Sequence, residues 1–173
     1  FDINYVQSNT ILSLLQNREY NNTNLSLIAF GDPVYEHINY NTVSYEESDF
    51  ASVFRSGSVE YSVNDIYGTF GYNNWPGLPG SKVELKKISE TINNTRLLTG
   101  YDASESNIKS FSQNDELLNY NIIHFATHGV IMPDIPEISA LVLRQTKSDM
   151  NNEDGYLTVS EVKNLKLKAN LVN

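Results

Sequence analysis

The chain has 173 residues, a formal net charge of −9, a pI near 4.7 and no cysteine. An apolar fraction of 40% at this length is enough for one folded domain with a hydrophobic core. The acidic balance disfavours direct binding to nucleic acid or to an anionic membrane, because both need basic patches. Without cysteine, the chain forms no disulfide and no thiolate metal site, and it supplies no thiol nucleophile.

The sequence also lacks the signals of export. No apolar run approaches the roughly 20 residues that a membrane-spanning helix needs. The N-terminal stretch FDINYVQSNT carries an acid and lacks the basic start of a signal peptide. We therefore expect a cytoplasmic protein that has no membrane partner and no direct nucleic-acid partner.

The first part of the chain predicts one helix, one strand and a long insertion. Residues 8–17 have the pattern of a short helix, with Ser8 as its N-cap. LSLIAF (25–30) is a continuous apolar run that ends in Gly-Asp-Pro, which is typical of a buried strand followed by a turn. Residues 36–77 are rich in Tyr, Asn, Ser and Gly, and they predict an irregular insertion outside the core.

Paired capping residues open three predicted helices in the remainder of the chain. Each pair is three positions apart, as in a capping box: Ser81 with Glu84, Asp102 with Glu105, and Thr158 with Glu161. The helices predicted from these pairs cover residues 82–92, about 102–112 and 157–165.

Apolar runs around these helices predict the other strands. They are TRLLTG (95–100), NIIHFAT (121–127), SALVLRQ (139–145) and KANLVN (168–173). Strands that alternate with capped helices predict an α/β fold, a three-layer sandwich with a mainly parallel central sheet flanked by helices. We expect one domain over residues 1–173. Sites in such sheets lie at the carboxyl ends of strands, here around His128 and after Asn173.

Two histidines in this region raise the question of a metal site. His124 and His128 are four residues apart, which is the spacing of a zincin helix. That motif needs a glutamate after the first histidine, and Phe125 stands there instead. The flanking residues favour a strand, on which positions four apart lie roughly 13 Å from each other. We therefore expect no metal site and no organic cofactor.

A calcium loop is a second candidate. In residues 150–161, EF-hand positions 3, 5, 6, 9 and 12 are occupied by Asn152, Asp154, Gly155, Thr158 and Glu161. Position 1 is Met150, which supplies no carboxylate, and the run before the loop looks like a strand rather than a helix. A turn followed by a helix cap explains the same residues. A calcium-responsive domain that uses this loop stays open as an alternative.

His128 is the remaining candidate for catalysis. A histidine at a strand end is held firmly by its backbone, and its chemistry suits proton transfer near neutral pH. Gly129 beside it allows close approach of a ligand, and its N–H could bind an oxyanion. From this motif alone, a structural histidine in a turn explains the residues at least as well.

Several segments in series resemble one family. In chain order they are LSLIAFGDPVY (25–35), LPGSKVEL (78–85), LLTGYDASESNIKS (97–110), IIHFATHG (122–129), SALVL (139–143) and DGYLTVSEVKNLKLKANLV (154–172). Together they resemble the CHAT domain, a caspase-like family of clan CD that is related to caspases and separase. The resemblance covers most of the chain, although residues 36–77 match poorly.

The resemblance implies a cysteine endopeptidase acting on a peptide or protein substrate. It implies that His128 is the catalytic base, that Gly129 is an oxyanion donor and that His124 is a supporting residue. In this family the usual continuation after LVN is Leu-Ser-Ala-Cys, so we expect the nucleophilic cysteine just after Asn173 on a complementary C-terminal segment. Asp32 and Asp102, near predicted strand ends, are candidates for contact with the substrate.

A base without a thiol cannot carry out this reaction, so we expect the chain alone to be inactive. Three explanations fit a chain that has the histidine of the family but not its cysteine: a processed fragment, a portion of a longer protein, or a natural pseudoenzyme. The resemblance also implies control by a partner, such as attached TPR repeats or an RNA-guided CRISPR effector in bacterial defence. A catalytically inactive interaction module on the same fold is the main alternative.

Overall fold

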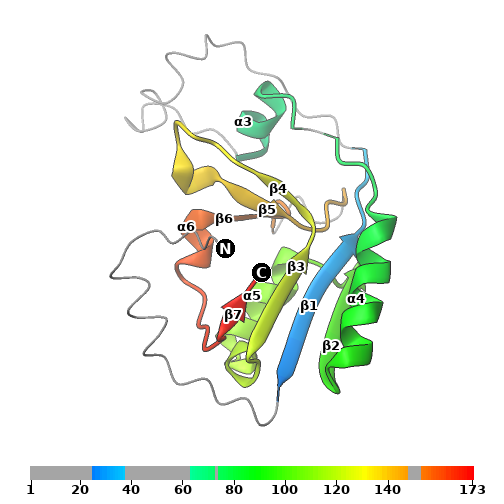
Figure 1. Cartoon of the computed structure of the whole chain (residues 1–173). Coiled ribbons are helices and arrows are strands. Elements are labelled where there is room, and N and C mark those ends of the chain that lie inside the picture. Colours follow the sequence, from blue (N-terminus) through cyan, green and yellow to red (C-terminus); the bar gives the residue numbers. More distant parts are fainter. Residues whose placement is uncertain (1–24, 38–62, 73, 148–152) are drawn as a thin grey trace, which may run out of the picture.

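The computed structural model describes residues 25–37, 63–72, 74–147 and 153–173. The helix predicted over 8–17, with Ser8, lies outside these ranges. The described residues form two sheets, one above the other in Figure 1, with helices packed around them. None of the helices in these ranges has both the length and the apolar character that crossing a bilayer requires.

The larger sheet is parallel and has the strand order β2-β1-β3-β7. Its strands are β1 (Ser26–Pro33), β2 (Asn94–Gly100), β3 (Ile122–Ala126) and β7 (Leu171–Val172). The central strand β1 is buried along nearly its whole length, which is what the continuous apolar run predicted. It pairs with β3 from Leu27 opposite Ile122 to Gly31 opposite Ala126.

Helices cover both faces of this sheet, as the sandwich prediction requires. Alternate residues of β1 face opposite layers, because a strand has a period of two. Leu27 and Ala29 pack against Leu85 of α4 (Pro79–Thr91). Phe30 faces the other way and packs with Ile108 of α5 (Glu105–Gln113). The α/β fold, a caspase-like sandwich, is therefore confirmed (Figure 1).

Two of the three predicted helix caps are wrong. Helix α4 begins at Pro79, so Ser81 lies inside the helix, where it donates to the Leu78 carbonyl (2.9 Å). The Ser81 hydroxyl also accepts from the backbone N–H of Asp32 at 2.7 Å, which ties α4 to the end of β1. For α5 the N-cap is Ser104 instead of Asp102. A capping pattern alone cannot show which of several neighbouring polar residues turns toward the helix end.

The third predicted cap is confirmed. The hydroxyl of Thr158 accepts from the Glu161 N–H, and the Glu161 carboxylate accepts from the Thr158 N–H. The helix that follows, α6 (Val159–Val162), is shorter than the predicted 157–165. Short 3₁₀ helices also occur at η1 (Glu116–Asn119) and η2 (Pro136–Ile138).

The smaller sheet is antiparallel and has the order β4-β5-β6. Its strands are β4 (His128–Val130), β5 (Ala140–Val142) and β6 (Tyr156–Thr158). The run 139–145, predicted as one strand, contributes only β5 here. The Leu143 N–H still binds Gly155 O, directly before β6, but the next N–H, of Arg144, binds Ala103 O, so the run leaves the sheet there.

One face of the small sheet is covered by α3 (Val63–Thr69), which is drawn at the top of Figure 1. Ile66 and Tyr67 of this helix are buried with Val130, Val142 and other residues of the small sheet and its loops. This part of the segment 36–77 is therefore a packed helix, and the prediction of an irregular insertion is wrong here. Residues 38–62 lie outside the described ranges.

Helix α4 packs so closely on β1 at Gly31 that a larger residue at this position should destabilise the fold. A Cβ at this position would lie 2.7 Å from Leu85 Cδ1 and 3.2 Å from the Cβ and the carbonyl oxygen of Ala126. We expect Gly31→Ala to lower the free energy of unfolding by about 1–3 kcal/mol, the cost of overpacking a core. Urea denaturation measures the change.

Gly129→Ala is the matched control, because its Cβ would meet nothing closer than the Ala140 carbonyl oxygen at 3.7 Å. We expect this variant to stay within about 0.5 kcal/mol of the parent. Equal destabilisation by both substitutions would contradict the tight packing of α4 on β1.

Candidate functional site

His128 lies where the chain passes from one sheet to the other. The strand β3 of the parallel sheet ends at Ala126, and β4 of the small sheet begins at His128. The imidazole is therefore at the carboxyl end of a parallel strand, as the sequence predicted. Its backbone is fixed from the other side by pairing with Val142 of β5.

One hydrogen bond determines which nitrogen of the His128 imidazole carries the hydrogen. The Nε2 atom lies 2.9 Å from the carbonyl oxygen of Pro76. A carbonyl oxygen can only accept, so Nε2 carries the hydrogen and donates it. In the neutral ring this leaves the lone pair on Nδ1, which is the nitrogen able to take a proton from another group.

Two aromatic rings pack beside the same imidazole. The ring centroid of Trp75 lies 5.1 Å from that of His128, and the centroid of Tyr35 lies 5.6 Å away. The Tyr35 hydroxyl donates to the Val142 carbonyl at 3.0 Å. Burial raises the pKa of Tyr35 well above its usual value, so its hydroxyl stays protonated at neutral pH. The imidazole is thus held between one hydrogen bond and two rings.

His124 has different partners and a different environment. It is buried, and its Nε2 donates to the Glu84 carboxylate on α4 at 3.0 Å. Its Nδ1 accepts from the side-chain amide of Asn173 at 3.0 Å. Both ring nitrogens are therefore used inside the protein, and the ring joins α4 to the end of the β7 segment.

The backbone of Asn173 continues the pairing of β7 with β3. Its N–H donates to Ile123 O at 3.0 Å, and its carbonyl accepts from Phe125 N–H at 2.7 Å. The side-chain bond to His124 adds a third link between the two segments. Asn173 is thus held in register beside β3, on the path that leads toward His128.

Gly129 follows His128 on β4 and is exposed. It lies opposite Leu141 in the small sheet. The space above its Cα is open, since the Ala140 carbonyl oxygen, 3.7 Å from an added Cβ, is the nearest atom. A ligand could therefore approach the backbone directly beside His128.

The model of the CHAT domain family matches residues 1–173, which is the whole chain. The chain belongs to the CHAT domain family. This family is linked to caspase-like cysteine peptidases, in agreement with the sandwich of two sheets and flanking helices described above. No curated protein and no solved structure matches the chain.

In this CHAT domain, Asp32 lies near the end of strand β1 and Asp102 follows β2, at the same end of the parallel sheet as His128. Asp32 adopts a left-handed backbone conformation with a φ of 47°, which is uncommon for a residue with a side chain. Its N–H is taken by Ser81, and the N–H of Asp102 is taken by Thr99 O. Among the described residues, neither carboxylate bonds to His128.

The predicted calcium loop has a different role in the part that the structure describes. Carboxylate oxygens of Glu105, Glu153 and Glu161 lie within 4.8 Å of one another. The ammonium group of Lys109 lies 2.6, 2.5 and 2.7 Å from these three carboxylates, in the place that a cation would take. The Asp154 carboxylate accepts from the backbone N–H of Tyr156 at 2.8 Å.

These contacts favour a structural role for the cluster over calcium binding. Residues 150–152 of the proposed loop lie outside the described ranges. Burial raises the pKa of the Glu105 carboxyl, while its bond to Lys109 opposes the shift. Glu105 also accepts from the N–H of Gly155, whose φ of +82° suits glycine. The cluster thus ties α5 to the turn before β6 and, through Glu161, to α6.

Three residues of the site were not predicted from the sequence. Trp75 and Pro76 belong to the segment predicted as an irregular insertion, although the WPGLPG stretch contains the only tryptophan of the chain. Glu84 was assigned to a helix cap, but it bonds to His124 instead. No local pattern reveals these contacts, because each joins residues 40 or more positions apart.

The lysine at the centre of the cluster has a clear predicted effect on stability. We expect Lys109→Met to lower the free energy of unfolding by about 2–3 kcal/mol, because it removes the partner of a buried carboxylate and leaves three acids together. Urea denaturation at neutral pH measures the change.

Lys166→Met is the control for loss of an ion pair at the surface. Lys166 pairs with Asp115 at 2.7 Å, but both side chains are more than half exposed. We expect an effect within about 1 kcal/mol. If added calcium raised the melting temperature of the parent protein while Lys109→Met had no effect on stability, the structural role would be wrong.

Proposed function

We propose that this CHAT domain carries the general base of a cysteine endopeptidase, and that His128 is this base. The observation that carries the proposal is the bond from His128 Nε2 to the Pro76 carbonyl at 2.9 Å. It leaves the lone pair on Nδ1, the atom that must accept the proton of a thiol. The family match to caspase-like proteins supports the same chemistry.

The proposed nucleophile is a cysteine on a segment that continues β7 beyond Asn173. In the present register Val172 lies opposite Ile123. Continuing this register step by step places the fourth position beyond Asn173 opposite His128. The continuation expected from the family, Leu-Ser-Ala-Cys, has its cysteine at this fourth position. Neighbouring strands are roughly 4.8 Å apart, which brings a thiol close to the imidazole.

Apolar surface beside β7 is available for the remainder of such a segment to pack against. A cavity of ≈ 70 Å³ beside β7 is lined entirely by apolar side chains, among them Phe30, Ile108, Leu165 and Val172. Leu171 and Val172 of β7 are about half exposed. We propose that the complementary C-terminal segment packs here, because apolar surface of this kind gains stability when it is removed from water.

In the proposed reaction, the thiol transfers its proton to Nδ1 of His128, and the thiolate attacks the carbonyl carbon of the scissile peptide bond. Backbone N–H groups, with Gly129 as one proposed donor, stabilise the charge on the carbonyl oxygen. The imidazolium then protonates the leaving amine, which leaves a thioester on the enzyme. Water hydrolyses the thioester with His128 again acting as base.

Asp32 and Asp102 are proposed to contact the substrate, since both lie at the end of the sheet where His128 is found. The exposed backbone at Gly129 leaves room for a substrate beside the imidazole. We also propose that a regulatory partner, either a repeat domain or an RNA-guided effector, binds this domain and controls its activity. It would act by changing access to this edge of the sheet.

The proposal is tested on the full-length protein that contains this domain. We expect His128→Ala to lower kcat for peptide cleavage by at least about 10³-fold, because the thiol loses its base. The unfolding curve should change little, since the imidazole is only partly buried. A peptide library with mass-spectrometric detection of the cleaved bonds measures the activity.

His37→Ala is the matched control, because His37 is exposed and lies after the end of the β1 region. We expect its activity to equal that of the parent. Cleavage that survives His128→Ala undiminished would rule out His128 as the base. Absence of cleavage from the full-length parent, in the presence of its partners, would favour the inactive interaction module instead.

A further inference from the structure

A single row of side chains crosses the small sheet from the candidate base to a buried tyrosine. His128 of β4 lies opposite Val142 of β5, and Val142 lies opposite Tyr156 of β6. Residues directly opposite each other in an antiparallel sheet point to the same face. The imidazole and the phenol therefore share one face of the sheet, with Val142 between them.

The segment 74–78 lies over this face and holds the partners of His128. It contains neither helix nor strand, and its last residue, Leu78, is tied to the start of α4 by hydrogen bonds from Ser81 to the Leu78 carbonyl. Pro76 provides the carbonyl that accepts from His128 Nε2, and Trp75 provides the ring beside the imidazole. The direction of the imidazole thus depends on where this segment is held.

The hydroxyl of Tyr156 holds the segment in place. It accepts a hydrogen bond from the indole Nε1 of Trp75 at 3.0 Å. It donates its own hydrogen to the backbone carbonyl of Tyr72 at 2.9 Å. The rings of Tyr72 and Trp75 are stacked with an interplanar angle of 2°, so the hydroxyl bonds to both residues of one stacked pair.

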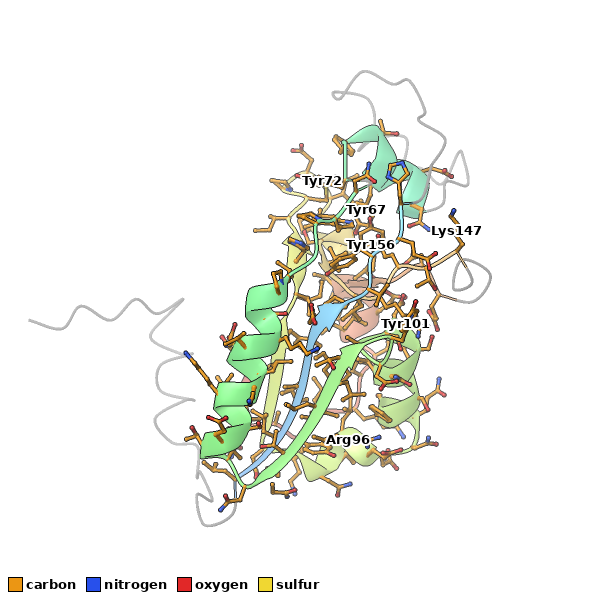
Figure 2. All side chains as sticks on the ribbon, turned by 90° about the vertical axis from the view of Figure 1, so that its right-hand side faces the viewer. Tyr67, Tyr72, Arg96, Tyr101, Lys147 and Tyr156 are labelled. Atoms are coloured by element: carbon orange, nitrogen blue, oxygen red, sulfur yellow. The ribbon has the colours of Figure 1, made fainter. Side chains whose placement is uncertain are left out.

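Tyr156 is well suited to act as a fixed anchor. Its ring is fully buried and packs against Tyr67 of α3 with a centroid distance of 4.2 Å. Burial raises the pKa of the phenol, so it remains protonated and can donate at neutral pH. Figure 2 shows Tyr72, Tyr67 and Tyr156 gathered at one end of the molecule, while Arg96 lies at the far end of β2.

We propose that Tyr156 is a positioning residue for the base: through Trp75 and Tyr72 it holds the Pro76 carbonyl in place, and this carbonyl keeps the His128 hydrogen on Nε2. The consequence for catalysis rests on the proposed function. The consequence for the tautomer of His128 does not, so it can be measured whether or not the protein cleaves peptides.

The test is Tyr156→Phe in the full-length protein, because this substitution removes the hydroxyl and keeps the ring in the core. In ¹⁵N-histidine spectra, assigned by the loss of the signal in His128→Ala, we expect the parent to show Nε2–H. The variant should show a mixture of both neutral tautomers. With the Trp75 indole no longer bonded, its N–H should exchange with water faster.

Catalysis gives a second readout of the same variant. We expect kcat to fall about tenfold, in line with the loss of one hydrogen bond, while KM changes little. A residue needed only for stability would change the unfolding curve without changing the tautomer. The split between kcat and KM and the tautomer therefore separate positioning from packing.

Tyr67→Phe is the matched control, because it removes a buried hydroxyl from the same cluster. That hydroxyl donates to the Ile138 carbonyl and makes no bond to segment 74–78. We expect this variant to keep the Nε2–H tautomer and the kcat of the parent. If Tyr156→Phe does not fold, Trp75→Phe removes the same hydrogen bond from the other side and should give the same mixed tautomers.

Two results overturn the inference. The first is a Tyr156→Phe protein, or its Trp75→Phe substitute, with the Nε2–H tautomer and kcat of Tyr67→Phe. The second is a parent protein whose His128 hydrogen is on Nδ1. A parent that keeps Nε2–H but cleaves no peptide contradicts the proposed function alone, because the tautomer change in Tyr156→Phe would still demonstrate positioning.

Discussion

The hydrogen bond between His128 Nε2 and the Pro76 carbonyl is the interaction on which the account of this site depends. An imidazole at a strand end can rotate and exchange its hydrogen between two nitrogens unless something fixes it. A carbonyl oxygen fixes it without adding charge, and it leaves Nδ1 available as an acceptor. The packing of α3 and segment 74–78 against the small sheet supports this one bond, because Trp75 and Tyr35 limit the movement of the ring.

Two sheets are needed to produce this arrangement. The parallel sheet delivers the backbone to its carboxyl edge, and the small antiparallel sheet then holds His128 from the side through Val142. Asn173 is tied to β3 by two backbone bonds and by His124, so the end of β7 is guided toward the same edge. The two histidines of the HFATH stretch therefore serve different purposes, one at the site and one in the support of a strand.

Sequence patterns predicted the parts of the fold that depend on local burial. The runs at 25–30, 95–100 and 121–127 are strands of the parallel sheet, and the run at 25–30 is apolar because β1 is buried between β2 and β3. Thr158 with Glu161 caps α6 as expected. The helix caps predicted at Ser81 and Asp102 were wrong because neighbouring residues compete for the same helix ends. Helix α3, Trp75 and Pro76 were missed because their packing is decided by β4, β5 and β6, which lie far away in the sequence.

We propose that His128 and a thiol beyond Asn173 form one reactive pair. This pairing is tested most directly by treating the full-length protein with a peptide that carries a thiol-reactive acyloxymethyl ketone, and mapping the adduct by mass spectrometry. We predict one adduct, on a cysteine in the segment that continues β7, which forms in the parent and not in His128→Ala. An adduct that forms equally fast without His128, or that maps to a cysteine elsewhere in the protein, would contradict it.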